Sequence, residues 1–439
     1  MSEQSSTGSA EKAKQGAETP RWGWVEAEIW TARMLSALEN GVTGGKWYSL
    51  IDKVYAPATL VLAWTKVQAN QGAAGVDGQS VERFAAKAEE YLSELSAALR
   101  AGTYRPQPVK RVEIPKGDGR LRPLGIPTVK DRIVQQAVRL VIEPIFESAF
   151  CEGSYGFRPE RGCKDALREV DRLLTEGYTH VVDADLQSYF DTIPHDRLMQ
   201  RVGERISDGR ILDLIRGWLK ADILHGLERW TPVEGSPQGA VISPLLANIY
   251  LDPLDRLIAE RGYLMVRYAD DFVILTRSHV EAEAALDLVR RWVAANGLVL
   301  HPDKTRIANC RKKGNGFEFL GYRFECGRRD VRKTSLDKLK ETIREKTKRT
   351  CGQSLTAVIV DLNRTLRGWF GYFKHAHPSI FSRLDQMIRR RLRAMLRRQT
   401  RRSGSGRAYS DHRQWPNAYF ANAGLFALRT AWQAARQSR

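Results

Sequence analysis

The pattern of apolar and polar positions predicts helices over residues 21–100 and again beyond about residue 335, with short strands between them. Residues 106–128 predict two short strands separated by a glycine-containing turn. Residues 179–187 (THVVDADLQ) are rich in β-branched residues, which is typical of a buried strand. Residues 262–278 (GYLMVRYADDFVILTRS) predict a strand, a tight turn and a second strand. The chain is therefore expected to mix helices with short strands.

Two of the predicted helices have recognisable first turns. Thr128 is expected to cap one helix, with Asp131 three residues later forming a variant capping box. Ser243 and Pro244 are expected to be the cap and first-turn proline of another. Pro253 interrupts the pattern of this second helix, so a kink or a restart is expected there.

A basic helix is predicted near the C-terminal end, because residues 386–402 (QMIRRRLRAMLRRQTRR) contain no acidic residue. Ile388, Leu392, Met395 and Leu396 recur at helical spacing and form one apolar stripe. A solvated helix would usually mix glutamates among its arginines. Their absence favours contact with phosphates. The arginines expected to bind nucleic acid are Arg389, Arg390, Arg393, Arg397 and Arg398.

The overall charge supports a polyanionic partner. The 439 residues carry 70 Lys and Arg against 51 Asp and Glu, a formal net charge of +19. Such an excess indicates nucleic acid or an acidic membrane surface, and the alternative is a solvated basic surface. The chain is 42% hydrophobic, which is enough for globular domains.

The five cysteines include no Cys-x-x-Cys pair, so a structural zinc is not expected. Free thiols in a reducing cytosol are expected instead. The polar first twenty residues are not expected to be a signal peptide. No apolar run approaches the length of a membrane span, so no membrane partner is expected.

The aspartates at the strand ends are the candidate chemistry. Period-two alternation places Asp183 and Asp185 on one face of their strand. Asp270 and Asp271 are adjacent, which a tight turn alone would explain. The alternative is a cation held between them and a third carboxylate, for which Asp185 is the best candidate. Neighbouring strands would then form an oxygen-rich site for magnesium. Two ions about 4 Å apart would stabilise the attacking and leaving oxygens of a phosphoryl displacement.

Several motifs, in order along the chain, resemble those of a known family. YADD at 268–271 resembles the catalytic box of reverse transcriptases. The further motifs are IPKGDGRLRPLGIP (114–127), SYGFRPERG (154–162), DLQSYFD (185–191), GSPQGAVISPLLANIYL (235–251), GLVLHPDKTRI (297–307), FEFLGYRF (317–324) and LNRTLRGWFGYF (362–373). From about residue 40 onward the chain is similar to bacterial group II intron-encoded reverse transcriptase/maturases, most closely to their class C branch.

The resemblance implies roles for the acidic residues. Asp185 and Asp270 would bridge two Mg²⁺ ions, Asp271 would support them, and the carbonyl of Leu186 would add a ligand. Lys304 would protonate the leaving pyrophosphate, and without the family it would be a surface lysine. Asp183 and Asp191 match no catalytic motif position and are expected to be structural and a turn or cap residue, respectively.

The resemblance also implies nucleotide contacts. Lys116 and Arg122 would hold the triphosphate of a dNTP, because a glycine turn brings two cations close to a polyanion. Phe190 would lie under the incoming sugar and exclude a 2′-hydroxyl, with core packing as the alternative. Gln238 would lie against the incoming nucleotide, with a turn amide as the alternative.

The implied fold is α+β, a right-hand polymerase with an antiparallel palm sheet followed by a helical thumb and maturase domain. The expected segments are a disordered tail (1–20), an N-terminal extension (21–104), fingers and palm (105–330), thumb/maturase (331–403) and a basic, aromatic end (404–439). The paired cysteines of the family's C-terminal nuclease are missing, so second-strand cleavage is not expected.

The implied function is RNA-directed DNA polymerisation together with binding and splicing of the protein's own intron RNA, which is copied into DNA during retrohoming. The implied partners are the intron RNA, an RNA template with a DNA primer, and target DNA. The expected location is the bacterial cytoplasm, at the nucleoid when DNA is bound. The oligomeric state is left open. The alternatives are a splicing-only maturase, another palm enzyme such as a viral RNA polymerase, and a domesticated reverse transcriptase of defence or CRISPR adaptation.

Overall fold

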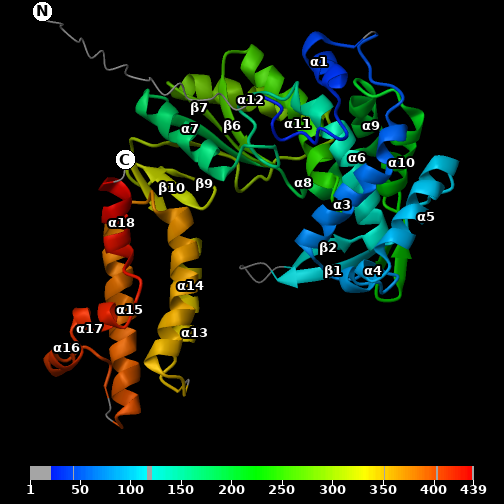
Figure 1. Ribbon diagram of the computed structural model, residues 1–439. Coiled ribbons are helices and arrows are strands. Elements are labelled where there is room, and N and C mark those ends of the chain that lie inside the picture. Colours follow the sequence, from blue (N-terminus) through cyan, green and yellow to red (C-terminus); the bar gives the residue numbers. More distant parts are fainter. Residues whose placement is uncertain (1–20, 43, 116–120, 351, 402–403, 438–439) are drawn as a thin grey trace, which may run out of the picture. The chain divides into compact units, whose positions relative to one another are not determined.

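The computed structural model describes residues 21–42, 44–115, 121–350, 352–401 and 404–437 (Figure 1). The expected tail at 1–20 and Lys116 lie outside these ranges. The chain divides into two compact units, which differ from the segments expected from the sequence. The first unit is Met1–Phe150, Arg158–Glu160 and Ile193–Tyr250, and the second is Cys151–Phe157, Arg161–Thr192 and Leu251–Arg439. The expected domain boundaries remain predictions.

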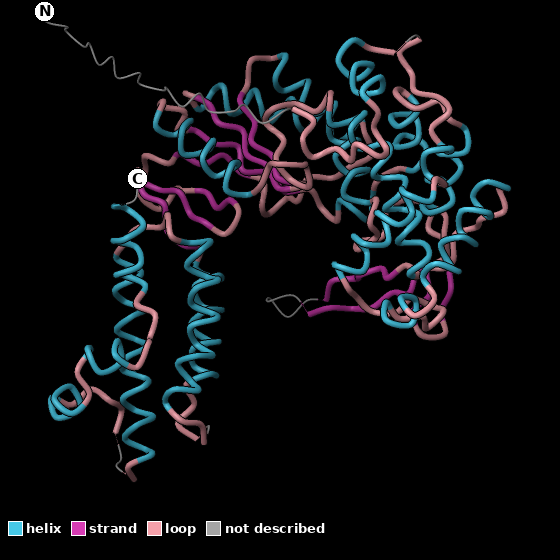
Figure 2. The backbone as a smooth tube through the Cα atoms, viewed as in Figure 1, coloured by secondary structure: helices cyan, strands magenta, loops and turns pink. Residues whose placement is uncertain are grey.

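The first unit is mainly helical and contains one small sheet of strand order β2-β1-β4-β5 (Figure 2). Its elements are α1 (Ala32–Asn40), α2 (Ile51–Val54), α3 (Pro57–Asn70), α4 (Val81–Ala85), α5 (Ala88–Ala101), β1 (Val109–Pro115), β2 (Leu121–Ile126), α6 (Val129–Glu147), α9 (His195–Gly203), α10 (Gly209–Leu219), β4 (Ile223–His225), β5 (Glu228–Trp230) and the first part of α11 (Ser243–Glu260). Strands β1 and β2 pair antiparallel, as the sequence predicted.

The predicted start positions of both helices are confirmed, and so is the cap of α6. Thr128 caps α6, because its hydroxyl accepts a hydrogen bond from the amide of Asp131. Helix α11 begins at Ser243. The restart expected at Pro253 is wrong, since α11 continues through this proline to Glu260. A helix tolerates the missing donor of a proline when packing holds the turns on either side, and Leu251 and Leu254 are fully buried.

The second unit contains two antiparallel sheets and the C-terminal helices. Its elements are α7 (Cys163–Thr175), β3 (His180–Asp185), α8 (Tyr189–Thr192), the rest of α11, β6 (Leu264–Tyr268), β7 (Asp271–Thr276), α12 (His279–Ala295), β8 (Arg306–Asn309), β9 (Phe317–Phe319), β10 (Tyr322–Glu325), β11 (Arg328–Val331), α13 (Lys333–Lys346), α14 (Leu355–Phe373), α15 (Ser379–Gln399), α16 (Tyr409–Gln414), α17 (Asn417–Asn422) and α18 (Leu428–Gln437).

The larger sheet has the strand order β6-β7-β3-β8, and a smaller sheet has the order β11-β10-β9. Helix α7 packs against β6, and α12 packs against β3, β7 and β8. Val181 of β3 pairs with Leu275 of β7, and both belong to the buried core of this unit. Toward the C-terminal end of β3, the same face carries the acidic side chains of Asp183 and Asp185.

The predicted apolar stripe of α15 is confirmed. Ile388, Leu392, Met395 and Leu396 are buried in the core that α15 shares with α13, α14 and the smaller sheet. No helix in the described parts of the chain is long and apolar enough to cross a membrane.

Candidate active site

Asp185 and Asp271 face each other across two neighbouring strands. The antiparallel register of β3 and β7 pairs Ala184 with Phe272 and Asp185 with Asp271. Directly opposed residues of an antiparallel pair project from the same face, with Cβ atoms about 4.5–5.5 Å apart. Two carboxylates that the sequence separates by 86 positions are thereby side by side. Like charges so placed are destabilising unless something compensates them.

The turn between β6 and β7 carries the remaining aspartate. Tyr268 is the last residue of β6 and pairs with Asp271, so Ala269 and Asp270 form the connection. Ala269 has a φ of +59°, a conformation that costs free energy for a residue with a Cβ. A strained residue persists only where its surroundings hold it. The contacts that fix this turn therefore position Asp270 and Asp271.

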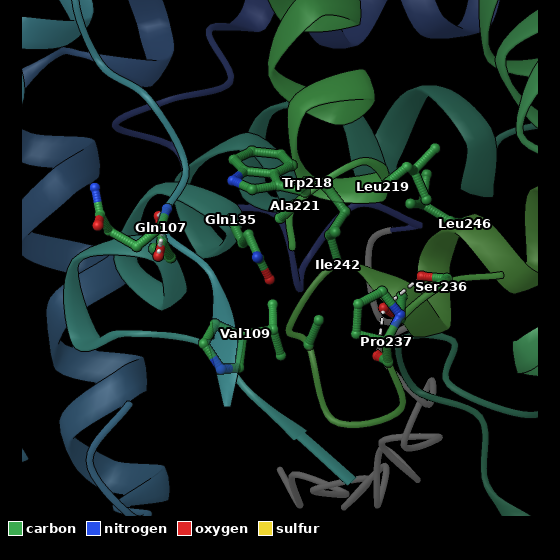
Figure 3. A pocket seen from close by; sticks show the side chains of 14 residues that line it. Gln107, Val109, Gln135, Trp218, Leu219, Ala221, Ser236, Pro237, Ile242 and Leu246 are labelled. Atoms are coloured by element: carbon green, nitrogen blue, oxygen red, sulfur yellow. Dashed lines mark hydrogen bonds between the residues drawn. The ribbon is translucent and has the colours of Figure 1, made fainter. Parts of the chain in front are cut away.

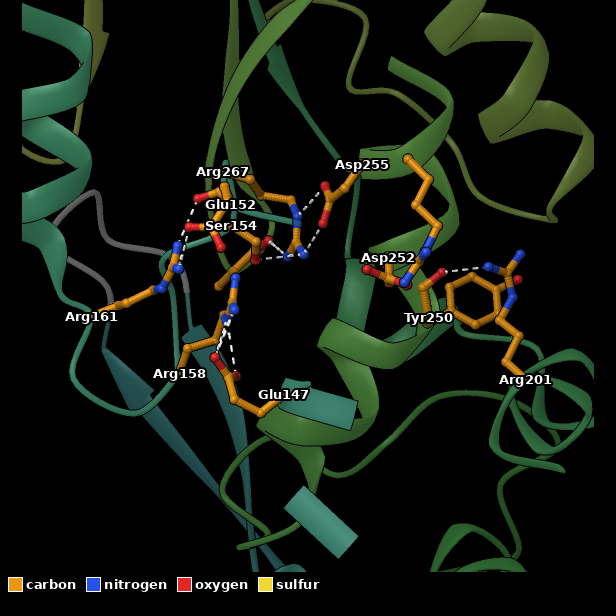
Figure 4. Close-up of polar contacts among 12 residues, drawn as sticks. Glu147, Glu152, Ser154, Arg158, Arg161, Arg201, Tyr250, Asp252, Asp255 and Arg267 are labelled. Carbon is orange, nitrogen blue, oxygen red and sulfur yellow. Dashed lines mark hydrogen bonds and ion pairs between the residues drawn. The ribbon is translucent and has the colours of Figure 1, made fainter. Parts of the chain in front are cut away.

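The contact that holds the turn comes from Arg267, whose side chain is fully buried (Figure 4). Its Nε and Nη2 donate to both carboxylate oxygens of Asp255 on α11, at 2.7 and 2.5 Å. Nη1 donates to the carbonyl of Ala269 at 2.8 Å, and Nη2 also donates to the Ser154 hydroxyl at 2.8 Å. One guanidinium thus ties the turn to α11 and to a segment far away in the sequence.

That segment, 153–156, pairs along β6. The Arg267 amide donates to the Gly153 carbonyl, and the Tyr155 amide donates to the Arg267 carbonyl, both at 2.8 Å. A Cβ on Gly156 would overlap the backbone nitrogen of Ala269, so glycine is required for this close approach. The motif SYGFRPERG therefore supports the acidic turn from one side.

The electrostatics of the acidic face follow from this crowding. Burial, with the nearby carboxylates of Asp183, Asp270 and Asp185, raises the pKa of Asp271 to about 7. Burial also raises the pKa of Asp183 to about 6, although the Arg306 guanidinium acts in the opposite direction. Arg306 Nε lies 3.5 Å from the Asp183 carboxylate, which agrees with the structural role expected for Asp183.

Lys304 contacts the first aspartate of this face directly. Its Nζ lies 2.5 Å from Oδ2 of Asp185, in a pair whose two side chains are partly exposed. The backbone nearby is fixed by the His301 amide, which donates to the Asp185 carbonyl, and by the Gln187 amide, which donates to the Val299 carbonyl. Neither bond uses the carbonyl of Leu186. The structure thus joins Lys304 to the acidic site, where the sequence without the family would have left a surface lysine.

The oxygen atoms of this acidic face are of the chemical type that binds a divalent cation. Within the described residues, no three carboxylate, histidine or cysteine side chains are placed to hold a metal ion together. However, Asp185 and Asp271 are opposed, the carboxylates raise the pKa of Asp271, and the ammonium of Lys304 lies against Asp185. A cation held by hard oxygen ligands would relieve the same repulsion. The ligand set Asp185, Leu186, Asp270 and Asp271 stays a prediction.

Phe190 is not part of the buried core. It lies on the single turn of α8, and its neighbour Tyr189 is the buried ring of the two, at 2% exposure. The two rings meet edge to face with centroids 5.5 Å apart. Phe190 remains partly exposed on the segment that follows Asp185. The expected role of Phe190 under the incoming sugar stays a prediction.

Arg122 and Gln238, both in the first unit, are linked through the backbone of β2. The Gly125 amide donates to the Gln238 carbonyl at 2.6 Å, and Arg122 is exposed three residues before Gly125 on the same strand. Gly239, with a φ of +107°, has no space for a Cβ against the Gly125 carbonyl. The loop that carries Gln238 therefore packs closely against the strand that carries Arg122.

The same loop is fixed by side-chain hydrogen bonds, some of which are drawn in Figure 3. Ser236 and Ser243 share a hydrogen bond of 2.6 Å, and the Ser243 hydroxyl also contacts the Pro237 carbonyl. Oε1 of Gln135 on α6 accepts a hydrogen bond from the Val241 amide at 2.9 Å. These bonds hold the backbone and leave the role of the Gln238 side chain a prediction.

One of the predicted nucleic-acid contacts on α15 is wrong. Arg393 is buried, its guanidinium donates to the Trp415 carbonyl and the Asn417 side chain, and it lies over the ring of Phe420. Periodicity placed it among exposed arginines, but α16 and α17 fold back over this face. Arg397 is paired with Asp411 of α16.

The other three arginines differ in exposure. Arg398 is exposed, and Arg389 and Arg390 are partly exposed. These three remain candidates for phosphate contact.

Two family models match the chain in succession. Residues 114–324 match the reverse transcriptase (RNA-dependent DNA polymerase) family, and residues 336–415 match the group II intron maturase-specific domain. The chain is 38% identical over 328 residues to protein YkfC of Escherichia coli (strain K12), which covers 65% of this chain and 84% of that protein.

The chain belongs to the group II intron-encoded reverse transcriptase/maturases. It is 37% identical over 207 residues to the group II intron-encoded protein LtrA of Lactococcus lactis subsp. cremoris, covering 46% of this chain and 34% of LtrA. The chain thus spans most of the first relative but about a third of the second. Among solved structures it matches the partial Cas6-RT-Cas1–Cas2 complex at 26% identity, over 56% of this chain and 41% of that chain. Its TM-score of 0.36 is too low to support a conclusion.

The family decides the class of the enzyme. The predicted fold, an α+β reverse transcriptase with an antiparallel palm sheet and a helical maturase domain, is confirmed. Because it contains a reverse transcriptase domain, the protein is an RNA-directed DNA polymerase by class. Enzymes of this class use nucleotide substrates and depend on a divalent metal. The sheet β6-β7-β3-β8 is its palm.

Sequence reasoning missed Arg267, Asp255 and Ser154. The available signal was an arginine inside an otherwise apolar strand, LMVRY, because a buried charge needs a partner. Its partners could not be named without the fold.

Proposed function

We propose that this reverse transcriptase/maturase binds a group II intron RNA, assists its splicing and copies it into DNA for insertion at a new site. The observation that carries the proposal is the pairing of Asp185 with Asp271 beside the Asp270 turn. Degenerate, splicing-only maturases would not need these three carboxylates. The basic thumb that follows supports binding of RNA as a polyanion.

The polymerase site takes dNTPs and two Mg²⁺ ions held by Asp185, Asp270, Asp271 and the Leu186 carbonyl. Ions held there would supply charge stabilisation for the attacking 3′-oxygen of the primer and for the leaving pyrophosphate. Arg267 keeps the turn in place, so that Asp270 and Asp271 need not reorganise during the reaction. Lys304, released from Asp185, donates a proton to the leaving pyrophosphate.

Four residues contact the incoming nucleotide. Arg122 and Lys116 bind the triphosphate, Gln238 lies against the nucleotide, and Phe190 excludes a 2′-hydroxyl. What supports this is the exposure of Arg122 and the partial exposure of Phe190. The template is RNA, and its primer is DNA.

The test compares the wild-type protein with the Asp270→Ala/Asp271→Ala variant in two assays. Primer extension on an RNA template with Mg²⁺ should give cDNA from the wild type only. Splicing of the cognate intron at low Mg²⁺ should be retained by both proteins. No cDNA from a folded wild type would overturn the polymerase part. No stimulation of splicing by either protein would overturn the maturase part.

A domesticated reverse transcriptase serving defence or CRISPR adaptation remains the second candidate. It would make cDNA equally well but would not stimulate splicing of a group II intron. The surrounding gene decides as well, because an intron-encoded protein lies inside its own ribozyme.

A further inference from the structure

A second basic surface lies in the second unit, on elements that carry none of the catalytic aspartates. It is a groove of about 400 Å³ between the β10–β11 turn, the segment after α14, and the last helix, α18. In Figure 1, α18 lies next to the small sheet that contains β10. Arg328, Lys374, His377, Trp432 and Arg436 line it. We call these five residues the C-terminal groove.

The charge of the C-terminal groove is unbalanced. Among the described residues that line it, the only carboxylate is Asp171, and this one is already paired with Arg329. Lys374 and Arg436 form no ion pair with any residue that the structure describes. Unpaired cations that converge on one groove repel each other and favour binding of an anion.

An aromatic ring lies among these cations. Trp432 is partly buried against the core of the unit, which fixes its orientation. Arg429 lies over this ring at 4.7 Å and Arg436 at 5.6 Å, both on the same helix. A partly buried indole next to cations has the composition of sites that stack a base and bind its phosphate. A single phosphate ion would leave the ring unused.

Hydrogen bonds connect the rest of the groove. Nη2 of Arg328 lies 3.0 Å from Nδ1 of His377, whose backbone amide donates to the Arg329 carbonyl at 2.8 Å. Arg329 in turn donates to the His375 carbonyl and lies over the Tyr322 ring. The β10–β11 turn is thereby fixed to the segment that joins α14 and α15. Such a preformed site loses little conformational entropy when a ligand binds.

We propose that the C-terminal groove binds one nucleotide unit of a single-stranded nucleic acid, with the base against Trp432 and the phosphate against Lys374 and Arg436. This inference rests on the proposed function, which supplies both RNA and DNA strands as ligands. Stacking on an indole is tolerant of sequence, since every base has a π face. The groove therefore holds a strand passing over it rather than selecting a site.

The test uses the full chain and fluorescein-labelled 12-mers of the same sequence, one of RNA and one of DNA. Binding is followed by anisotropy over a series of salt concentrations. The groove variant is Lys374→Ala/Arg436→Ala. The control variant is Arg261→Ala/Arg291→Ala, which removes two exposed arginines of the same unit that do not line the groove.

The groove variant should bind at least one of the two strands about tenfold more weakly than the control. Its slope of log K against log[salt] should be smaller in magnitude by about 0.7, because one phosphate contact is lost. The strand that loses affinity identifies the ligand as RNA, DNA or both. Equal affinities and slopes of the groove and control variants for both strands would overturn the proposal.

Trp432 supplies an independent measurement. Trp432→Leu should weaken binding of the same strand, and Trp432→Phe should restore most of it, while thermal unfolding shows that both remain folded. Primer extension on a pre-annealed, saturating template and primer should be unchanged in the groove variant. If the wild type makes no cDNA, the proposed function fails, whereas the comparison of strand binding still decides the groove.

Discussion

Arg267 and Asp255 form a fully buried, two-pronged ion pair directly behind the catalytic turn. Because the same guanidinium also donates to the Ala269 carbonyl, the pair joins α11 to the residue that precedes Asp270. The burial of Asp255 and Arg267 is costly unless every donor and acceptor is used. Here the ion pair fixes a strained turn and so positions Asp270 and Asp271.

Arg267→Lys should reduce both stability and polymerisation. A lysine retains the charge but cannot reach Asp255, Ala269 and Ser154 from one planar group. Disrupting a buried pair costs about 3–5 kcal/mol, so the urea midpoint should fall clearly. Primer extension should be measured well below the unfolding temperature. A variant as active as the wild type under those conditions would show that Arg267 has no positioning role.

Asp255→Asn serves as the matched test of the same contact. Asparagine keeps one acceptor for Arg267 but supplies no negative charge, so the guanidinium should shift relative to the turn. We expect a loss of stability at least as large as for Arg267→Lys, because the buried guanidinium loses its counter-charge, and a loss of polymerisation in the same direction. A change in stability alone would assign the pair to folding.

Asp185→Asn should abolish cDNA synthesis without destabilising the protein. Removing the charge relieves the repulsion with Asp271, so the melting temperature should stay equal or rise. The activity should fall at least about a hundredfold, as for other groups that stabilise developing charge. Differential scanning fluorimetry and single-nucleotide incorporation measure the two effects. A destabilised Asp185→Asn protein would show that the ion pair of Asp185 with Lys304 outweighs the repulsion from Asp271.

Phe190→Ala should change the choice of sugar, and Tyr189→Ala should change stability. Tyr189 is buried at 2% exposure, so its truncation should cost about 3–5 kcal/mol. Phe190 is partly exposed, so its truncation removes less packing. Its removal should mainly raise incorporation of ribonucleotides relative to deoxyribonucleotides. The ratio of kcat/KM for the two sugars is the measurement. An unchanged ratio would remove Phe190 from the nucleotide site.

Arg393→Ala and Arg398→Ala should separate folding from RNA binding on one helix. Arg393 satisfies the Trp415 carbonyl and Asn417, so its loss should lower the melting temperature of the thumb. Arg398 is exposed, and its loss should leave stability unchanged. Intron RNA should then bind more weakly, with a salt slope smaller in magnitude by about 0.7–0.9. Equal salt slopes for Arg398→Ala and wild type would exclude this phosphate contact.

The sequence by itself determined the local elements and the residues at their ends. Alternation and β-branching placed Asp185 at the end of a strand, and the adjacent aspartates marked a turn. Helical spacing gave the apolar stripe of α15, and Thr128 gave the start of α6. These features depend on neighbours within one or two turns of chain, which is why a pattern can predict them.

Only the tertiary structure decided which of these residues meet. The register that opposes Asp185 and Asp271 depends on pairing across 86 positions, and a slip of one residue would have turned one of them to the other face. The same holds for the buried charges. Arg267 finds Ser154, which lies 113 positions away, and Arg393 is covered by helices that follow it. A local pattern places a side chain on a face, but what covers that face is set by contacts that are remote in sequence.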